Sequence, residues 1–383
     1  MFGIAAFVLL GLVGAAFDYS RAALVQTGMQ RAVDSAALLA ARNRETVSTH
    51  TVADGEARVQ LRSAFDVDQL QAVSISYTVL EDRVRVEAQG QLRTTLTNVI
   101  GFRNLPVSST AEAIFGDTKV EIALVLDNTG SMNQNGKLAT LKEAAHNFLN
   151  KMQANGGNPE ATRIAIVPFD TNVNLGSLRT SSWVDPASTG HWTSHPRTTG
   201  CIWDRKEPND VSDTAPVSGD TLFSADPTRT RDCSIGPILP LTSNYTDLHA
   251  SITGMAGGGN TNTTIGLVWG YHVLSRSEPI TNAAAFGTRN LTKYLILMTD
   301  GDNTQNRSTQ NATMIDNRTR QVCDNIRAAG VQVFTARIVE GNASLLQGCA
   351  TQPSMYYDVQ SPSQLEPVFN SIYAQITGTR LAR

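Results

Sequence analysis

A run of oxygen-bearing side chains follows an apolar segment in the stretch VLDNTGSM. Asp127 ends the apolar run, and Thr129 and Ser131 follow at alternate positions, so both hydroxyls can face the same side as the carboxylate. A second apolar segment, LILMTDGDN, ends in Asp300, and the Gly-rich stretch GGGNTNTTIGL places Thr261 ahead of a helical pattern. Two carboxylates and three hydroxyls are hard oxygen ligands of the kind that Mg²⁺, or alternatively Mn²⁺, prefers.

These five side chains lie in separate connections of a predicted parallel sheet. Strands are predicted for KVEIALVLD, RIAIVPF, NLTKYLILMTD and VQVFTARIV, and helical patterns such as GKLATLKEAAHNFLNKM and TTIGLVWGYHVLS lie between them. Continuous apolar strands that alternate with helices are typical of a doubly wound, mostly parallel sheet with helices on both faces. Ligands of such sheets bind beyond the carboxyl ends of the strands, so we expect the five side chains to hold one cation there.

One interval interrupts this α/β pattern. Residues 170–245 contain no convincing helix, many Thr, Ser, Pro and Asp residues, and two of the four cysteines, Cys201 and Cys233. We interpret the interval as a disulfide-stabilised insertion, because a structureless loop of this length is uncommon in a compact domain. Nearest-neighbour pairing, which would also join Cys323 to Cys349, is our first choice among three connectivities, and four buried thiols are the alternative.

The N-terminal part of the chain has a different organisation. Residues 1–17 carry no charge and, as a helix, would span about 25 Å, the lower limit for a membrane crossing, so we expect an uncleaved anchor. A cleaved signal peptide and a buried helix are the alternatives. Residues 18–44 continue the helical pattern, either as an amphipathic helix that packs on its own domain or as a pilin-like stalk. From Val73 the apolar period becomes two, which predicts a small α+β unit that ends near residue 116.

Composition limits the classes of partner. The formal net charge is −3 and the pI about 6.1. The chain therefore lacks the excess of basic residues that is typical of proteins that bind nucleic acid. The sequence contains no Cys-x-x-Cys pair of the kind that binds zinc. It also contains no recognisable Ser-His-Asp or Cys-His arrangement of the kind that nucleophilic enzymes use. We therefore expect a protein that binds rather than an enzyme.

The oxygen cluster resembles the metal-ion-dependent adhesion site (MIDAS) of von Willebrand factor A domains. The family's first motif is Asp-x-Ser-x-Ser, and Thr129 replaces its first serine while keeping the hydroxyl. The domain would cover residues 119–378. The whole layout resembles the TadG-type proteins of bacterial Tad/Flp pilus-assembly systems, through DYSRAALVQTGMQRAVDSAALLAA, the small β unit, LVLDNTGSM, CDNIRAAGVQVFTARI, LLQGCA and YYDV.

This resemblance implies a single-pass inner-membrane protein with its bulk in the periplasm or outside the cell. It implies a pilus assembly or adhesion factor whose bound cation recognises protein partners of the pilus machinery or an extracellular acidic ligand. Two alternatives have different consequences for the same five residues. One is a metal-dependent hydrolase, which would need a general base at the metal, and the other is a structural scaffold with a vestigial metal site.

Overall fold

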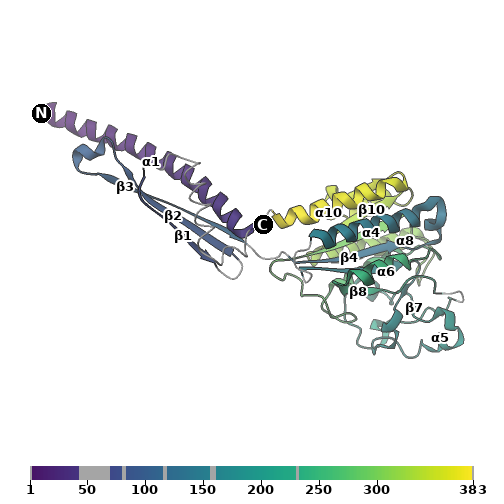
Figure 1. Ribbon diagram of the computed structural model, residues 1–383. Coiled ribbons are helices and arrows are strands. Elements are labelled where there is room, and N and C mark those ends of the chain that lie inside the picture. Colours follow the sequence, from purple (N-terminus) through teal and green to yellow (C-terminus); the bar gives the residue numbers. More distant parts are fainter. Residues whose placement is uncertain are drawn as a thin grey trace. The chain divides into compact units, whose positions relative to one another are not determined.

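The computed structural model describes residues 2–42, 70–79, 83–114, 119–155, 161–229 and 233–381 of the 383-residue chain. The chain divides into two compact units, Met1–Gly116 and Asp117–Arg383, and each unit is described by itself (Figure 1). This division shows no boundary near residue 17. The predicted anchor at residues 1–17 and the predicted stalk from residue 18 therefore stay predictions. Glu81 and Asp82, which interrupt the alternating pattern after Val73, predict a turn between two strands, and this turn lies outside the described residues.

The first unit is one long helix on a three-stranded sheet. Helix α1 (Phe2–Arg42) packs against the antiparallel sheet of β1 (Leu70–Val79), β2 (Arg83–Arg93) and β3 (Asn104–Ile114), in the order β1-β2-β3 (Figure 1). The apolar face of α1 and alternate residues of β2 form a common core, which includes Met29, Ala32, Val33, Ala36, Val84, Val86 and Ala88. This core shows that residues 29–40 of α1 pack on their own domain, and the pilin-like stalk stays a prediction.

The alternation expected along β1 is interrupted at its beginning. Val73 is 38% exposed, although the period of two predicts that its side chain points inward with Ile75 and Tyr77. The pairing of β1 with β2 shifts between Gln71 and Ser74, so an extra residue changes which side chains face α1. The prediction for Val73 was therefore wrong, because a bulge leaves no signal in a binary apolar pattern.

Asp18 joins α1 to the connection between β2 and β3. Its buried carboxylate accepts hydrogen bonds from the amides of Thr95, Leu96 and Thr97 and from the Thr97 hydroxyl, at 2.8–3.0 Å. Burial by itself raises the pKa of Asp18, but these four bonds outweigh it and lower the pKa to about 2. The carboxylate thus holds the sheet connection to the helix.

Among the described residues, no helix is both long and apolar enough to cross a membrane. The anchor predicted for residues 1–17 therefore rests on the sequence alone.

The second unit is built on a six-stranded sheet, in the order β11-β10-β9-β4-β5-β8. All neighbouring strands are parallel except the edge pair of β5 and β8, so the predicted α/β architecture is confirmed as a mixed, mostly parallel sheet. The strands are β4 (Lys119–Asp127), β5 (Thr162–Phe169), β8 (Leu239–Thr242), β9 (Leu291–Thr299), β10 (Gln332–Ile338) and β11 (Tyr356–Val359).

Helices cover both faces of this sheet, as expected from its apolar strands. Side chains on one face of β4 pack with α4 (Lys137–Asn155), α6 (Tyr245–Thr253) and α10 (Leu365–Leu381). Side chains on the other face pack with α7 (Thr263–Leu274), α8 (Ala312–Ala328) and α9 (Ala343–Cys349). Neither α6 nor α9 was predicted, and both are short helices, of 9 and 7 residues.

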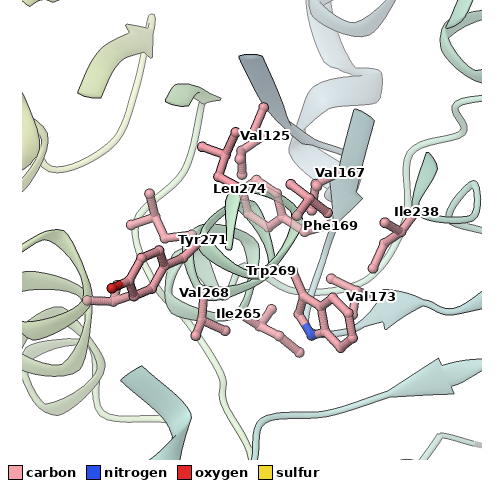
Figure 2. Packing of buried hydrophobic residues seen from close by; sticks show 14 of the residues in the cluster. Val125, Val167, Phe169, Val173, Ile238, Ile265, Val268, Trp269, Tyr271 and Leu274 are labelled. Atoms are coloured by element: carbon pink, nitrogen blue, oxygen red, sulfur yellow. The ribbon is translucent and has the colours of Figure 1, made fainter. Parts of the chain in front are cut away.

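Helix α7 lies directly on the sheet, and every one of its residues is buried. Figure 2 shows Ile265, Val268, Trp269, Tyr271 and Leu274 of this helix among side chains from the strands. Two glycines on α7 permit the close approach. A Cβ at position 266 would lie 2.7 Å from the ring of Phe169, and a Cβ at position 270 would lie 2.6 Å from Cγ2 of Val125.

The segment predicted as an insertion is largely irregular but contributes one strand to the core. It holds the short elements β6 (Val173–Asn174), α5 (Gly190–Ser194) and β7 (Cys201–Ile202), together with several 3-10 turns. β8 lies within residues 170–245 yet belongs to the central sheet, so the irregular segment ends before Leu239. The disulfides join Cys201 to Cys233 and Cys323 to Cys349, which confirms nearest-neighbour pairing.

Candidate metal site

Strand register brings the two carboxylates together. Leu126 of β4 pairs with Met298 of β9, so Asp127 lies beside Thr299 and one position before Asp300. The Thr299 hydroxyl donates a 2.5 Å hydrogen bond to Oδ2 of Asp127. Both carboxylates are therefore fixed at the carboxyl edge of the sheet, where the sequence predicts the site.

A chain of hydrogen bonds links four of the five predicted ligands. Asp127 Oδ1 accepts from the Thr129 amide at 2.7 Å, and the hydroxyls of Thr129 and Ser131 are 2.9 Å apart. The Ser131 hydroxyl donates to Oδ1 of Asp300 at 2.7 Å. Asp127 and Asp300 are 0% exposed, whereas Ser131 is partly exposed, so the cluster meets solvent on the side of Ser131.

Thr261 reaches the same place from the Gly-rich loop. The Gly259 carbonyl accepts a hydrogen bond from the Gly130 amide at 3.1 Å, which ties this loop to the loop after β4. A Cβ at position 301 would lie 2.9 Å from Oγ1 of Thr261, so the hydroxyl lies against the residue that follows Asp300. Gly259 itself has a φ of +76°, and a Cβ there would meet Asp170 Oδ2 at 2.4 Å, so glycine is required.

The electrostatics of the cluster fit a cation. Burial, and secondly the charge of Asp300, raise the pKa of Asp127 to about 6, despite hydrogen bonds from Thr299 and Thr129 that lower it. When Asp127 is ionised, the hydrogen bonds from Thr299 and Thr129 compensate only part of the cost of its buried negative charge. Together with converging hydroxyl oxygens, that charge matches the hard oxygen set of a divalent ion. The residues that would hold it are Asp127, Thr129, Ser131, Thr261 and Asp300.

One residue of this cluster, Lys137, was not predicted from the sequence. Its Nζ donates to Oδ2 of Asp300 at 2.7 Å and lies 3.4 Å from Oε2 of Glu340, and its side chain is 1% exposed. Burial lowers the pKa of Lys137, but the hydrogen bond and charge of Asp300 outweigh it, and the pKa is raised. A usable signal was its position: a basic residue at the first position of a helix opposes the helix dipole, which suggests a specific anionic partner.

A polar cavity of about 900 Å³ adjoins the Gly-rich loop. Its walls come from the Gly-rich loop, from both ends of the irregular segment between β5 and β8, and from Gln305 in the loop after β9. They include Thr171, Arg197, Asp226, Arg229, Gly258 and Asn260. Arg229 contacts both oxygens of Asp170, at 3.2 and 3.0 Å, and so fixes the irregular segment to the end of β5. The cavity therefore lies next to the loop that carries Thr261.

Over the described ranges, no three His, Cys, Asp or Glu side chains come together as a metal-binding group. The candidate site differs from such a group because three of its five side chains carry hydroxyls. Asp302, which follows closely in sequence, is exposed and outside the hydrogen-bond chain described above.

The fold defines a von Willebrand factor A-like class of α/β protein, and the family model for the von Willebrand factor type A domain matches residues 235–371. That match includes Thr261 and Asp300 and begins after the first motif. A second model, the putative Flp pilus-assembly TadE/G-like family, matches residues 1–43. The two matches are those of a TadG-type protein with a von Willebrand factor A domain, which confirms the resemblance drawn from the sequence.

Several solved structures are similar to this chain at low identity, whereas no curated protein matches it. The von Willebrand domain of the type V pili tip protein Mfa5 from Porphyromonas gingivalis is 13% identical, with a TM-score of 0.43 over 68% of this chain and 96% of that one. The pilus adhesin SpaC from Lactobacillus rhamnosus GG is 14% identical, with a TM-score of 0.42 over 82% of this chain and 35% of that one.

Proximal thread matrix protein 1 from the mussel byssus, in a structure with a zinc-occupied MIDAS motif, is 17% identical, with a TM-score of 0.38. The alignment covers 67% of this chain and 46% of the mussel chain, so this chain spans under half of that protein.

Proposed function

We propose that this protein is an assembly or adhesion factor of a Tad/Flp pilus system and that it binds an acidic side chain of a protein partner through Mg²⁺ or Mn²⁺. The TadE/G-like match at residues 1–43 supports the pilus system. The apolar, uncharged residues 1–17 support an inner-membrane anchor, with the second unit in the periplasm or outside the cell. The two disulfides agree with an oxidising compartment.

The hydrogen-bond chain from Asp127 through Thr129 and Ser131 to Asp300 carries the proposal. Two buried carboxylates without full compensation are costly to keep in a fold, and a cation removes that cost. The hydroxyl lone pairs of Thr129, Ser131 and Thr261 are suited to bind the ion directly, while the carboxylates balance its charge. A bound divalent ion supplies an electrophilic position for a carboxylate from the partner.

The partly exposed side of the cluster, at Ser131, is where a partner would approach. The polar cavity beside the Gly-rich loop gives room for residues that flank the acidic side chain. Asp302, the candidate general base for a hydrolase, is exposed and outside the hydrogen-bond chain, so binding rather than hydrolysis is the proposed role.

Calorimetric titration of the full chain with MgCl₂ and MnCl₂ tests the metal site. Asp127→Asn should abolish uptake of either ion, because the amide keeps the shape of the side chain but removes its charge. The Asn oxygen can accept from the Thr129 amide, and its NH₂ can donate to the Thr299 hydroxyl, so the metal-free variant should unfold at a temperature no lower than the native chain. Asp324→Asn, on the exposed face of α8, is the matched control and should bind metal normally.

The other outcomes separate the alternatives. Metal uptake that Asp127→Asn leaves unchanged would place the ion elsewhere and defeat the proposal. A native chain that binds neither ion would indicate a structural scaffold. Turnover of an ester or phosphate panel that is lost in Asp127→Asn would indicate a metal-dependent hydrolase.

A further inference from the structure

Lys137 places a fixed positive charge inside the candidate metal site. It is the first residue of α4, and its side chain, like that of its partner Asp300, is almost fully buried. Nζ lies 2.7 Å from Oδ2 of Asp300, and the other oxygen of Asp300 accepts from Ser131 at 2.7 Å. Both oxygens of Asp300 are thus already engaged by donors from the protein.

The charge count of the site follows from this contact. Asp127 and Asp300 contribute two negative charges, and Lys137 contributes one positive charge, so the buried cluster carries a net charge of about −1 when both carboxylates are ionised. Glu340, the second partner of Lys137, is 67% exposed, so water screens its charge. A divalent ion would convert the cluster to about +1, and one carboxylate from a guest would return it to neutrality.

Without Lys137 the same two carboxylates would neutralise a divalent ion completely. The lysine therefore disfavours the ion alone, through repulsion at short range in a buried setting. It equally favours the ion together with an anionic guest. By linkage, a guest that tightens metal binding must itself be bound more tightly by the metal-loaded protein, by the same factor.

We propose that Lys137 determines the specificity of this site for anionic guests by making metal binding weak alone and strongly coupled to a carboxylate. The proposal rests on the proposed metal-binding function. Lys137 acts through Asp300 and through its charge, so it is a specificity-determining residue that does not itself contact the guest.

The test is calorimetric titration of Mg²⁺ into the full chain, in sodium chloride and in sodium acetate at equal ionic strength, with acetate as the carboxylate probe. Native protein should bind Mg²⁺ several-fold more tightly in acetate, within the roughly 5–150-fold range of typical couplings. Lys137→Met should bind Mg²⁺ about tenfold or more tightly in chloride, and acetate should add little. Lys142→Met removes the same charge from the same helix, where Nζ contacts the Thr253 carbonyl, and should behave as native.

Thermal unfolding with and without Mg²⁺ is a second test, which also applies if Lys137→Met folds poorly. Removing Lys137 leaves Asp300 buried without its cation, so metal-free Lys137→Met should unfold at a lower temperature, and Mg²⁺ should raise that temperature more than in the native chain. If Lys137→Met folds only with Mg²⁺ present, that dependence is the expected result in its strongest form. Lys137→Arg keeps the charge and should retain the acetate effect.

Two results would overturn the inference while leaving the proposed function intact. One is native metal binding together with weaker Mg²⁺ binding in Lys137→Met, which would mean that the lysine only positions Asp300. The other is an acetate effect of equal size in both proteins. A native chain that binds no Mg²⁺ in either salt would refute the proposed function and the inference with it.

Discussion

The close approach of α7 to the sheet can be tested at Gly270. A Cβ there would lie 2.6 Å from Cγ2 of Val125 and 2.7 Å from Cδ1 of Leu295, whereas carbon atoms in contact are normally about 3.5–4.0 Å apart. Both neighbours are 0% exposed, so neither side chain can turn into solvent. The helix must therefore move away from the sheet by roughly 1 Å, or the two strands must rearrange.

The magnitude follows from two opposed effects of Gly270→Ala. Overpacking a buried contact costs typically about 1–3 kcal/mol of unfolding free energy. Replacing glycine by alanine inside a helix returns up to about 1 kcal/mol. We therefore expect a net loss of about 1–2 kcal/mol in the urea unfolding of the second unit, with an unchanged m value. Because Val125 lies two residues before Asp127, Mg²⁺ affinity should fall as well.

Gly348 of α9 supplies the matched control, because a Cβ there meets no atom within 4 Å. Gly348→Ala should leave stability unchanged or raise it by a few tenths to about 1 kcal/mol. If Gly270→Ala were as stable as the native chain while Gly348→Ala behaved as expected, the contact between α7 and the sheet would be looser than the distances imply. The account of how α7 is placed would then be refuted.

Two further predictions concern the joint at Asp18 and the second disulfide. Asp18→Asn should speed hydrogen exchange of the amides at residues 95–97, because an NH₂ group would face donors that the carboxylate accepts. Since folding lowers the pKa of Asp18 from 3.8 to about 2, its stabilising effect is complete above about pH 4, and the difference between variant and native chain should shrink as pH falls towards 2. Replacing Cys323 and Cys349 by Ser, which opens a loop of separation 26, should lower the unfolding free energy by about 3–4 kcal/mol, measured by urea unfolding. An unchanged midpoint in the double variant would contradict this estimate.

Much of the second unit could be predicted because its strands are continuous apolar runs and its long helices have clear periods. β4, α4 and α7 lie where the sequence indicates, and apolar residues of α4 such as Leu141 and Phe148 are buried. Asp127 and Asp300 come together for the simple reason that parallel strands end at one edge of the sheet. That these side chains lie together could thus be predicted from residue type and strand order, and the binding of a metal there stays a prediction.

What could not be predicted depends on contacts between segments far apart in the sequence. Lys137 follows a short turn after the first motif, but its partner Asp300 is 163 residues away, and nothing in the local pattern pairs them. β8 has only 4 residues and lies in a Pro- and Thr-rich context, so its pairing with β5 decides its structure. His146 and His249 likewise meet, with Nδ1 atoms 2.6 Å apart, only because α4 and α6 pack together.

The irregular segment between β5 and β8 shares its apolar interior with the domain beneath it. Trp183 and Phe223 from this segment have ring centroids 6.1 and 4.7 Å from that of Trp269 on α7, and all three side chains are buried. Removing the segment would expose the apolar side of α7 that it covers and leave a hydrophobic patch on the surface. The irregular segment is therefore an integral part of the domain. Exposed residues of the segment can vary freely only as long as these three buried aromatic side chains are kept.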